Sequence, residues 1–583
     1  MFYRTHNLKE LKADDINTKV TLAGWVHRVR DLGKIIFIDL REKSDFFQVV
    51  FDSDQYDLFA KAGQLKTEWV VSVTGTIRKR ATANPNLLNG DLELVAEELN
   101  ILNEAQTPPF SINDDTKRTE EVTRLTYRYL DLRKPKNQEI IIKRHLITKA
   151  IRDFLNEQDF NEIETPILTK STPEGARDFL VPSRIYNGKF FALPQSPQLF
   201  KQLLMMAGFE KYYQVTKCFR DEDLRLDRQP EFTQIDLELS FVTEKEIIEL
   251  TNKLLQAAFE AVNLPFPRVI TYLTYQEAID YYGTDAPDLR FDLKFVNITS
   301  IFKNSNFQVF REISENNGLI KGFKIPKGQK LLSRKKIDEL QELIKPLGIK
   351  GLSYIHYISK EEQTSPIFKF LTEAERQTVL ADFYAEPEDT ILIIADQNHK
   401  LVNTALSKLR LITADWFDLK TKDFCLAWVT DFPLFEIELE TNSLTSTHHP
   451  FTLPREIELL DKNPLLVHSF AYDIVLNGIE LGGGSLRIHD PKLQNKIFLM
   501  LGLGEAEIKE KFGFFINALN YGTPPHGGLA LGLDRLVMML TQVNSLRDVI
   551  AFPKTQNMIC PLSNAPSIIG INQLKELGLN IEK

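Results

Sequence analysis

Cysteine is scarce in this chain: its 583 residues include only Cys218, Cys425 and Cys560. These cysteines are far apart and form no CxxC pair, so the sequence favours buried thiols over a disulfide framework, and we expect no zinc site. Long apolar runs are also missing. No stretch approaches the roughly 20 apolar residues that span a bilayer, and the N-terminus lacks an apolar core of signal-peptide length. We therefore expect a cytoplasmic protein with no membrane partner.

Neither sign of charge dominates the composition. The chain has 71 Lys and Arg against 80 Asp and Glu, which gives a net charge of −9, and 43% of its residues are hydrophobic. This balance, without any long biased tract, excludes disordered, collagen-like and coiled-coil chains and predicts a large globular protein with several domains. The acidity argues against indiscriminate coating of nucleic acid, but it allows a local basic or aromatic face.

The first hundred residues predict a small β-barrel. Five strands with one helix between the third and the fourth is the chain order of an OB-fold, whose face commonly binds single-stranded nucleic acid, although other small barrels give a similar pattern. The strands are expected at residues 20–27, 35–41, 46–51, 69–77 and 91–96, and the helix at 56–65.

The rest of the chain predicts a multidomain α+β protein with one domain inserted into another. A polar segment containing Pro108-Pro109 marks a linker. A strand-rich, glycine-punctuated pattern occurs on both sides of a separate α+β segment that contains no catalytic constellation. The expected boundaries are an OB-fold domain at 1–104, a linker at 105–136, a catalytic domain at 137–285 and 423–583, and the inserted α+β domain at 286–422.

A hairpin around residue 225 is the first segment that could support chemistry. In its second strand, period-two alternation places Gln234, Asp236 and Glu238 on one face. The preceding loop mixes Arg220 with other charged residues, a composition suited to gripping a phosphate. The alternative at this stage is a solvated, salt-bridged hairpin loop.

A second hairpin is predicted at Asn477-Gly478, a strong signal for a two-residue turn of type I′. That turn pairs Asp473 with Gly482 and places Asp473 and Glu480 on the same face. Two carboxylates so placed can share a divalent cation bound to phosphate oxygens. The alternative is an ordinary hairpin with exposed carboxylates.

A third segment predicts a helix that begins near Gly532. Its apolar stripe faces a core and leaves Arg535 in the first turn, where an arginine and main-chain N–H groups together favour an anion. The segment matches neither a P-loop nor a GxGxxG loop. By itself, an arginine at a helix start is more often structural than catalytic.

Together, these segments resemble the class II aminoacyl-tRNA synthetases. Phe219-Arg220 resembles motif 2, the glycine-rich strand with Glu480 resembles the strand before motif 3, and Gly532-Leu533-Asp534-Arg535 resembles motif 3 itself. Motif 1 is matched by a helix ending near Phe160 and then Glu162-Ile163-Glu164-Thr165-Pro166. Residues 170–178, 195–202 and 219–236 narrow the resemblance to the bacterial-type aspartyl-tRNA synthetases, and it covers nearly the whole chain.

This resemblance implies an N-terminal OB-fold that binds the anticodon and a class II antiparallel-sheet catalytic domain. The implied reaction joins L-aspartate to ATP as aspartyl-adenylate and then transfers the aspartyl group to tRNA(Asp), with Mg²⁺ on the phosphates. Matched catalytic positions are Arg220, Glu480 and Arg535. Matched ATP positions are Arg220, Asp221, Glu222, Gln229, Glu480, Gly532, Leu533, Asp534 and Arg535. Matched aspartate positions are Glu174, Ser196, Gln198, Lys201, Arg220, Asp236, His448, His449 and Arg487, and the matched Mg²⁺ ligands are Asp473 and Glu480.

The resemblance also assigns a role to the barrel and an oligomeric state. Phe37 matches an aromatic residue that stacks on an anticodon base, although strand parity alone leaves open that Phe37 belongs to the barrel core. Pro166 of motif 1 implies a homodimer. The positions at or near the family's anticodon contacts are Arg28, Arg30, Phe37, Gln48, Arg78, Arg80 and Glu93.

Several rival interpretations remain at this stage. The enzyme could be non-discriminating and charge tRNA(Asn) as well as tRNA(Asp). A sister asparaginyl or lysyl enzyme is disfavoured by the pairing of Lys201 with Arg487. A catalytically inactive, synthetase-like regulator that binds RNA is disfavoured because Arg220, Glu480 and Arg535 are all present.

Overall fold

The computed structural model describes residues 3–43, 45–113, 119–172, 175–224, 227–359, 362–438 and 441–581. In the described part of the chain, no helix is long and apolar enough to cross a membrane. All three cysteines are free and buried, as the sequence predicted. The chain forms two compact units. The first comprises Met1–Leu146, Asp223–Pro230 and Thr541–Leu574, and the second comprises Ile147–Glu222, Glu231–Leu540 and Lys575–Lys583.

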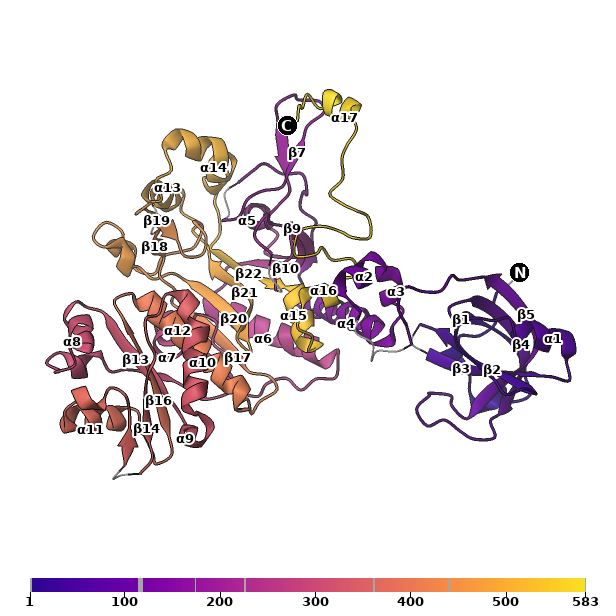
Figure 1. The fold of residues 1–583 in the computed structure, drawn as a ribbon. Helices are drawn as coiled ribbons and strands as arrows, with labels where there is room; N and C mark the ends of the chain where they lie inside the picture. The colour runs from indigo at the N-terminus through magenta and orange to yellow at the C-terminus, as the bar shows by residue number, and fades with distance from the viewer. Residues whose placement is uncertain are drawn as a thin grey trace. The chain divides into compact units, whose positions relative to one another are not determined.

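The first unit begins with a closed five-stranded barrel of order β1-β2-β3-β5-β4 (Figure 1). Helix α1 lies between β3 and β4, which confirms the OB-fold order. Strand alternation places Ile36 and Ile38 in the core at 1% and 0% exposure, whereas Phe37 between them is half-buried and faces outward. The elements are β1 (Lys19–Asp31), β2 (Ile35–Glu42), β3 (Asp45–Asp52), α1 (Tyr56–Ala62), β4 (Val70–Lys79) and β5 (Leu92–Asn103).

Short helices complete the first unit. The buried Arg128 in α3 holds them together, since its guanidinium donates to the main-chain oxygens of Ala551 and Ile550 and to the carboxylate of Asp131. The helices are α2 (Glu121–Thr126), α3 (Arg128–Asp131) and α16 (Leu546–Val549). Two more helices, α4 (Pro135–Glu157) and α17 (Ile571–Glu576), each cross the division between the units in the sequence. The finer domain boundaries expected from the sequence stay predictions.

The second unit is built on an eight-stranded sheet of order β11-β17-β20-β21-β22-β10-β9-β6. The six central strands are antiparallel, and only the edge pairs β11–β17 and β6–β9 are parallel. This confirms the expected antiparallel sheet. Its strands are β6 (Asn161–Glu162), β9 (Lys211–Phe219), β10 (Glu231–Ser240), β11 (Ile270–Thr274), β17 (Leu426–Thr430), β20 (Ala471–Leu476), β21 (Ile479–Leu486) and β22 (His526–Gly532).

Helices and two short hairpins surround this sheet. Helix α6 shows how the local sequence fixes an end: the Thr243 hydroxyl accepts from the Glu246 N–H while the Glu246 carboxylate accepts from the Thr243 N–H. The helices are α5 (Gln198–Met206), α6 (Glu244–Glu260), α7 (Tyr275–Tyr282), α13 (Pro491–Met500), α14 (Glu505–Leu519) and α15 (Leu533–Leu540). The hairpins pair β7 (Leu180–Pro182) with β8 (Phe190–Ala192) and β18 (Phe435–Ile437) with β19 (Leu444–Ser446).

A separate five-stranded sheet of order β12-β13-β16-β14-β15 forms the α+β segment expected from the sequence. Alternate residues of β16 enter two cores: Leu392 and Ile394 pack with α10 and α12, whereas Ile391 and Ile393 pack with α8 and α11. Both faces are therefore covered, as Figure 1 shows. The elements are β12 (Phe295–Asn297), α8 (Gln308–Glu315), β13 (Leu319–Ile325), α9 (Gly328–Leu331), α10 (Arg334–Ile344), β14 (Ser353–Tyr357), β15 (Gln363–Thr364), α11 (Glu373–Asp382), β16 (Thr390–Asp396) and α12 (His399–Trp416).

The hairpin between β20 and β21 turns at Asn477-Gly478, where both residues have positive φ, of 54° and 84°. The predicted pairing of Asp473 with Gly482 is wrong, because Asp473 pairs with Gly483. The cause is a β-bulge that inserts one extra residue of β21 into the ladder. The bulge shifts side-chain alternation by one position, so strand parity cannot place Asp473 and Glu480 on one face.

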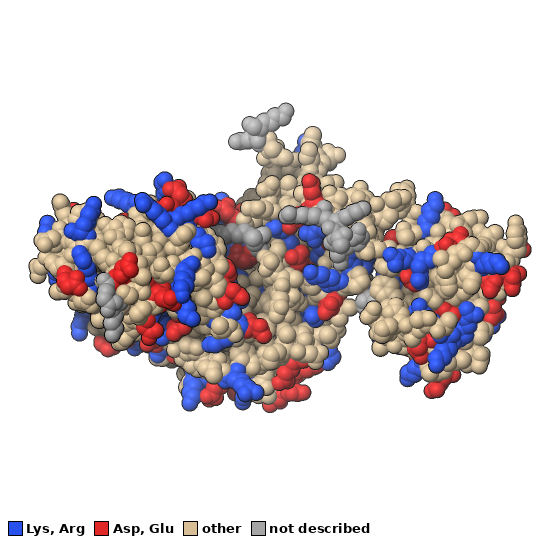
Figure 2. All heavy atoms as spheres, turned by 60° about the horizontal axis from the view of Figure 1, so that its bottom comes forward, with Lys and Arg blue, Asp and Glu red and all other residues tan. Residues whose placement is uncertain are grey.

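Surface charge is mixed in sign. Figure 2 shows lysine and arginine side chains interspersed with aspartate and glutamate side chains on the face drawn. On that face, the net charge of −9 is therefore not gathered into a single acidic region.

Candidate active site

Strand β10 supplies two carboxyl groups to one face of the central sheet. Asp236 and Glu238 alternate with Ile235 and Leu237, and all four are at most 1% exposed. Lys201 of α5 places its Nζ 2.8 Å from Asp236 Oδ1 and 3.2 Å from Glu238 Oε2. Two buried carboxyl groups therefore share one buried ammonium group.

Arg487, directly after β21, joins the same cluster. Its Nε and Nη2 donate to the two oxygens of Glu238 at 2.9 and 3.1 Å. Its Nη1 donates to Ser485 Oγ at 2.7 Å and to His449 Nε2 at 2.6 Å. Because a guanidinium only donates, His449 Nε2 is the acceptor in that contact. Asp236 pairs with Lys201, whereas Glu238 pairs with both cations.

Burial and charge act against each other in this cluster. Burial raises the pKa of Glu238, but Arg487 and Lys201 outweigh it and hold the pKa below its usual value. For Asp236, burial outweighs the attraction of Lys201, so its pKa is raised. Burial and then the charge of Arg487 lower the pKa of His449 well below its usual value, so that imidazole is neutral near pH 7.

Donor counting shows how the cluster could hold a further anion. Arg487 has five N–H groups, of which four have the acceptors named above. Lys201 has three, of which one donates to Asp236, and the same nitrogen forms an ion pair with Glu238 at 3.2 Å. Within the described ranges, each cation thus keeps at least one N–H without a protein acceptor. Remaining donors on two neighbouring buried cations suit a carboxylate.

Glycine is required where the carboxylates approach the neighbouring backbone. A Cβ on Gly528 of β22 would lie 2.0 Å from Glu238 Oε2, and a Cβ on Gly483 of β21 would lie 2.0 Å from Asp473 Oδ1. No other residue fits these two positions without displacing a carboxylate. The sequence analysis noticed the glycine run but could not connect each glycine to a particular side chain.

Asp473, Glu480, His448 and Arg535 form a neighbouring group. His448 Nε2 lies 3.2 Å from Asp473 Oδ1, and Arg535 Nη1 donates to the main-chain oxygen of Glu480 at 2.9 Å. Burial lowers the pKa of His448, but Asp473 and Glu480 outweigh it, so the pKa is raised. Desolvation, and then the charge of Asp473, raise the pKa of Glu480. Despite the bulge, the two carboxylates are therefore close enough to repel each other.

This pair of carboxylates has the chemistry of a hard-cation site. Mg²⁺ is usually bound through one or two carboxylates together with substrate phosphates, so Asp473 and Glu480 fit it. A cation between them would relieve the repulsion that raises the Glu480 pKa. No cluster of three or more potential metal-ligating His, Cys, Asp or Glu side chains occurs among the residues that the structure describes.

The end of the β9–β10 hairpin holds Arg220 over the ring of Phe232, 5.2 Å from its centroid. The neighbouring Asp221 is half-buried, and its main-chain N–H donates to Arg177 O at 3.1 Å. Glu222 is also half-buried. Gln229, in the other unit, is buried, and its amide bonds both main-chain groups of Lys554.

The motif 3 residues connect β22 to α15. Gly532 ends the strand and Leu533 begins the helix. The Asp534 carboxylate accepts from the Thr233 N–H at 2.7 Å, which ties the helix to β10. Arg535 is thereby placed beside Glu480.

Two further residues that were predicted to bind the substrate aspartate lie at the start of α5. Ser196 is half-buried just before the helix, and Gln198 is buried at its first turn. In the described part of the chain, Gln198 Nε2 and His448 Nδ1 are buried without a hydrogen-bond partner. Glu174 lies outside the described residues.

Of the seven residues that were predicted to contact the anticodon, six contact one another on the barrel. Gln48 Oε1 accepts from Arg30 and Arg80, and Gln48 Nε2 donates to Glu93 at 2.6 Å. Arg78 donates to the other oxygen of Glu93, and Arg30 lies 5.5 Å from the centroid of the Phe37 ring. Arg28 is exposed on the same strand as Arg30, and none of these contacts includes it.

Sequence reasoning missed Glu238, Gln195 and Asp39 as site residues. Glu238 was recognisable, because it shares the alternation that singled out Asp236. Gln195 lay in a recognised segment without a role of its own. Asp39 accepts from Arg30 at 3.0 Å across two strands, a pairing that becomes visible only with the register.

Comparison with known proteins places the fold and site in a family. The model "tRNA synthetases class II (D, K and N)" matches residues 120–556, and the model "OB-fold nucleic acid binding domain" matches residues 20–102. The chain therefore belongs to the class II tRNA synthetases of the D, K and N group.

Two similar relatives are aspartate–tRNA ligases, a narrower group within this class. Over the full length of both chains, the sequence is 48% identical to an aspartate–tRNA(Asp/Asn) ligase of Natranaerobius thermophilus. It is 49% identical to an aspartate–tRNA ligase of Clostridium botulinum, covering 100% of this chain and 98% of the relative. The fold matches an asparaginyl-tRNA synthetase of Pyrococcus horikoshii with a TM-score of 0.60 at 18% identity, covering 95% of this chain and 99% of the other.

Proposed function

We propose that this protein is an aspartate–tRNA ligase that activates L-aspartate with ATP and transfers it to tRNA(Asp). The observation that carries the substrate choice is the pair of unused N–H groups on the buried Arg487 and Lys201. The side-chain carboxylate of aspartate accepts from both. Asparagine offers one carbonyl oxygen and turns an NH₂ group toward a cation, a mismatch that costs roughly 10⁴-fold in comparable sites.

The other side chains divide the remaining work of activation. Arg220 bridges the α-carboxylate of aspartate and the α-phosphate of ATP and stabilises the charge that develops as a carboxylate oxygen attacks phosphorus and pyrophosphate leaves. Arg535 binds the γ-phosphate. The site for the α-ammonium group comprises Glu174, Ser196, Gln198, His448 and His449.

Asp473 and Glu480 are the residues that would hold Mg²⁺. A bound Mg²⁺ neutralises phosphate charge and orients the pyrophosphate. The adenine portion of ATP is assigned to Glu222 and Gln229, with Asp221 and residues 532–534 framing the nucleotide. Because the Gln229 amide is engaged with Lys554, its contribution is to hold that main chain in place.

The barrel binds the anticodon loop. Phe37 offers an outward-facing ring for stacking, and Arg30, Arg80 and Gln48 beside it offer donors and acceptors to base edges. We place the reaction in the cytoplasm with its tRNA and ATP substrates. A homodimer is supported by Ile167 and Leu168, which directly follow Pro166 of motif 1 and are 41% and 52% exposed.

A second candidate is a non-discriminating ligase that also charges tRNA(Asn). The relative from Natranaerobius thermophilus has this activity in its name, as does one from Thermoanaerobacter pseudethanolicus at 47% identity. A catalytically inactive regulator is not favoured, because these full-length relatives are named as ligases and the matched catalytic arginines and Glu480 are present.

The test combines two assays. ATP–pyrophosphate exchange should depend on aspartate and not on asparagine, and labelled aspartate should be attached to a transcript of tRNA(Asp). Comparable charging of a tRNA(Asn) transcript would establish the second candidate. Folded protein without exchange in the presence of aspartate would overturn both.

A further inference from the structure

Three chain segments meet beside the candidate active site within the second unit. They are residues 176–178, residues 193–195 before α5, and residues 219–221 at the end of β9. The Phe219 N–H donates to Pro194 O at 2.9 Å, and the Asp221 N–H donates to Arg177 O at 3.1 Å. These two bonds fix the residues on either side of Arg220 to the other two segments.

The side chain of Gln195 links two of these segments by hydrogen bonds. Its Oε1 accepts from the Ala176 N–H at 3.0 Å, and its Nε2 donates to Ala176 O at 2.8 Å and to Asp178 Oδ1 at 2.6 Å. Gln195 is only 3% exposed. The amide thus bonds both main-chain groups of Ala176, as a neighbouring strand would, and fixes its own orientation by doing so.

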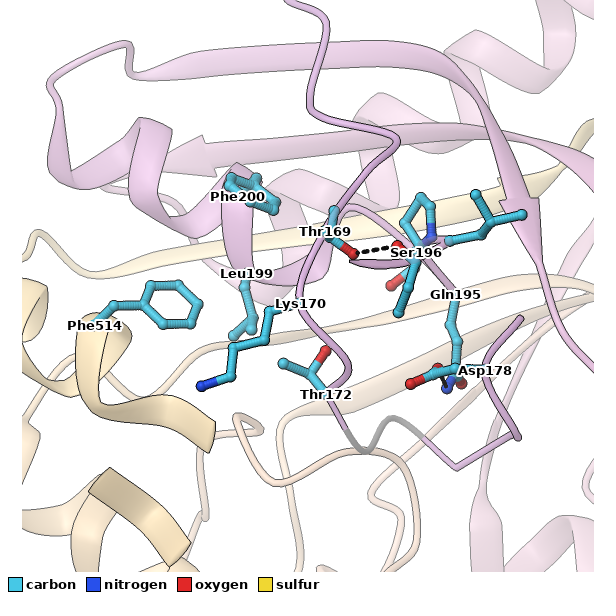
Figure 3. Close-up of a pocket in the computed structure, with 12 residues that line it drawn as sticks. Thr169, Lys170, Thr172, Asp178, Gln195, Ser196, Leu199, Phe200 and Phe514 are labelled. Carbon is cyan, nitrogen blue, oxygen red and sulfur yellow. Dashed lines mark hydrogen bonds between the residues drawn. The ribbon is translucent and has the colours of Figure 1, made fainter. Parts of the chain in front are cut away.

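Asp178 completes the cluster. Its second oxygen accepts from Ser171 Oγ at 2.6 Å, so one carboxylate joins Gln195 to the chain seven residues before Asp178. Figure 3 shows the side chains of Gln195 and Asp178 adjacent to each other beside Ser196. These residues line a cavity of about 50 Å³, which has room for a few water molecules.

We propose that Gln195 is a positioning residue for the activation step, which neither the resemblance nor the matched positions assigns. Its clamp on Ala176 and Asp178 holds the wall next to Ser196, and the bond from Asp221 to Arg177 extends the same wall to the segment that carries Arg220. The clamp therefore sets the geometry of the aspartate-binding and ATP-binding segments together. This inference rests on the proposed function.

Substitutions at Gln195 test the clamp. Gln195→Ala removes three hydrogen bonds and should raise the KM for aspartate about tenfold and the KM for ATP several-fold in pyrophosphate exchange. Gln195→Glu should be worse, because it places a second carboxylate against Asp178 and the Ala176 carbonyl. The melting temperature should fall in both because buried polar groups lose their partners, but binding of an isolated anticodon stem-loop should stay close to wild type.

Rescue distinguishes positioning from general stability. Asp178→Asn keeps an acceptor for Gln195, and its amide can donate to Ser171, so its KM values should stay near wild type. In the double variant Gln195→Glu with Asp178→Asn, the new amide donates to the new carboxylate, and KM for aspartate should recover at least threefold relative to Gln195→Glu. Asn403→Ala, which removes a buried amide from the inserted domain, is the matched control and should leave both KM values unchanged.

Two outcomes would overturn the inference. Unchanged KM values in Gln195→Ala would show that the clamp is dispensable, and a fall in melting temperature with no rescue by the double variant would assign Gln195 to stability alone. Absence of aspartate-dependent exchange in the wild type would instead refute the proposed function, so the two failures can be told apart.

Discussion

The central sheet and the inserted sheet of the second unit bury charge in opposite ways. In the central sheet, Lys201, Arg487, Asp236 and Glu238 are all at most 2% exposed and face one another. In the inserted sheet, the buried Lys321 has Asp280 at 3.9 Å as its one ion-pair partner among the described residues, and its Nζ also donates to the Asn403 side chain and a main-chain carbonyl. One sheet gathers mutually paired ions, whereas the other isolates one.

This difference helps to distinguish a ligand-binding site from a buried charge that only belongs to the fold. Ion pairs buried in a core contribute little net stability, since desolvation offsets their attraction. A cluster of four is therefore better explained by what it binds than by the fold. The inserted sheet has apolar cores on both faces. Lys321 is therefore better explained by the fold than by a ligand that it binds.

Arg487→Lys, in the central sheet, should cause the largest loss of activity. Lysine keeps the charge but loses the planar fork that bonds Glu238 and faces the substrate, so kcat/KM for aspartate should fall roughly 10³-fold in pyrophosphate exchange. Arg410→Lys is the matched control, because Arg410 of α12 is equally buried and, within the described ranges, its hydrogen bonds go to main-chain carbonyls. Equal losses of activity in both variants would contradict the distinction.

Glu238→Gln should affect stability and binding together. It leaves Lys201 and Arg487 facing one carboxyl group, and breaking a buried pair in this way typically costs about 3–5 kcal/mol of unfolding free energy. With Arg487 displaced, the KM for aspartate should rise on the order of 10²-fold. A lower melting temperature with an unchanged KM would make Glu238 a structural residue only.

Phe37→Leu tests the barrel, where the half-buried Phe37 ring faces outward. Loss of stacking on an anticodon base should weaken the binding of tRNA by about 1–3 kcal/mol. This corresponds to a rise in the KM for tRNA of about 5- to 150-fold in aminoacylation. Exchange without tRNA should be unaffected, because aspartate and ATP do not use the barrel. An unaltered KM for tRNA would leave Phe37 without a role in recognition.

Lys321→Met should have the smallest effect on activity. It should instead change how the free energy of unfolding depends on pH. Burial lowers the pKa of Lys321 from 10.5 to about 8 in the folded protein. Between these pH values the unfolded chain holds a proton that the folded chain lacks, so wild-type stability rises with pH by up to about 3 kcal/mol. The variant should lack this rise while keeping exchange within about twofold of wild type. Parallel pH profiles of thermal unfolding would refute it.

The sequence alone determined the elements and most of the residue types at the site. Period-two alternation put Ile36 and Ile38 on the face opposite Phe37 and put Asp236 on a polar face of β10, because adjacent strand residues face opposite ways. The structure then showed that the two isoleucines are the residues inside the barrel. The Asn477-Gly478 turn was equally local, since its two positive φ angles suit these two residues. Motif resemblance then linked segments that lie hundreds of residues apart.

Only the tertiary structure decided which groups meet. A one-residue bulge in β21 overturned the predicted pairing of Asp473, because a bulge reverses side-chain parity without an unambiguous local signal. The grip of Glu238 on Arg487 joins residues 249 positions apart. Likewise, the amide of Gln195 bonds the backbone of Ala176, whose N–H and C=O are the same in any sequence. Such contacts depend on strand register and loop path, which the whole fold determines.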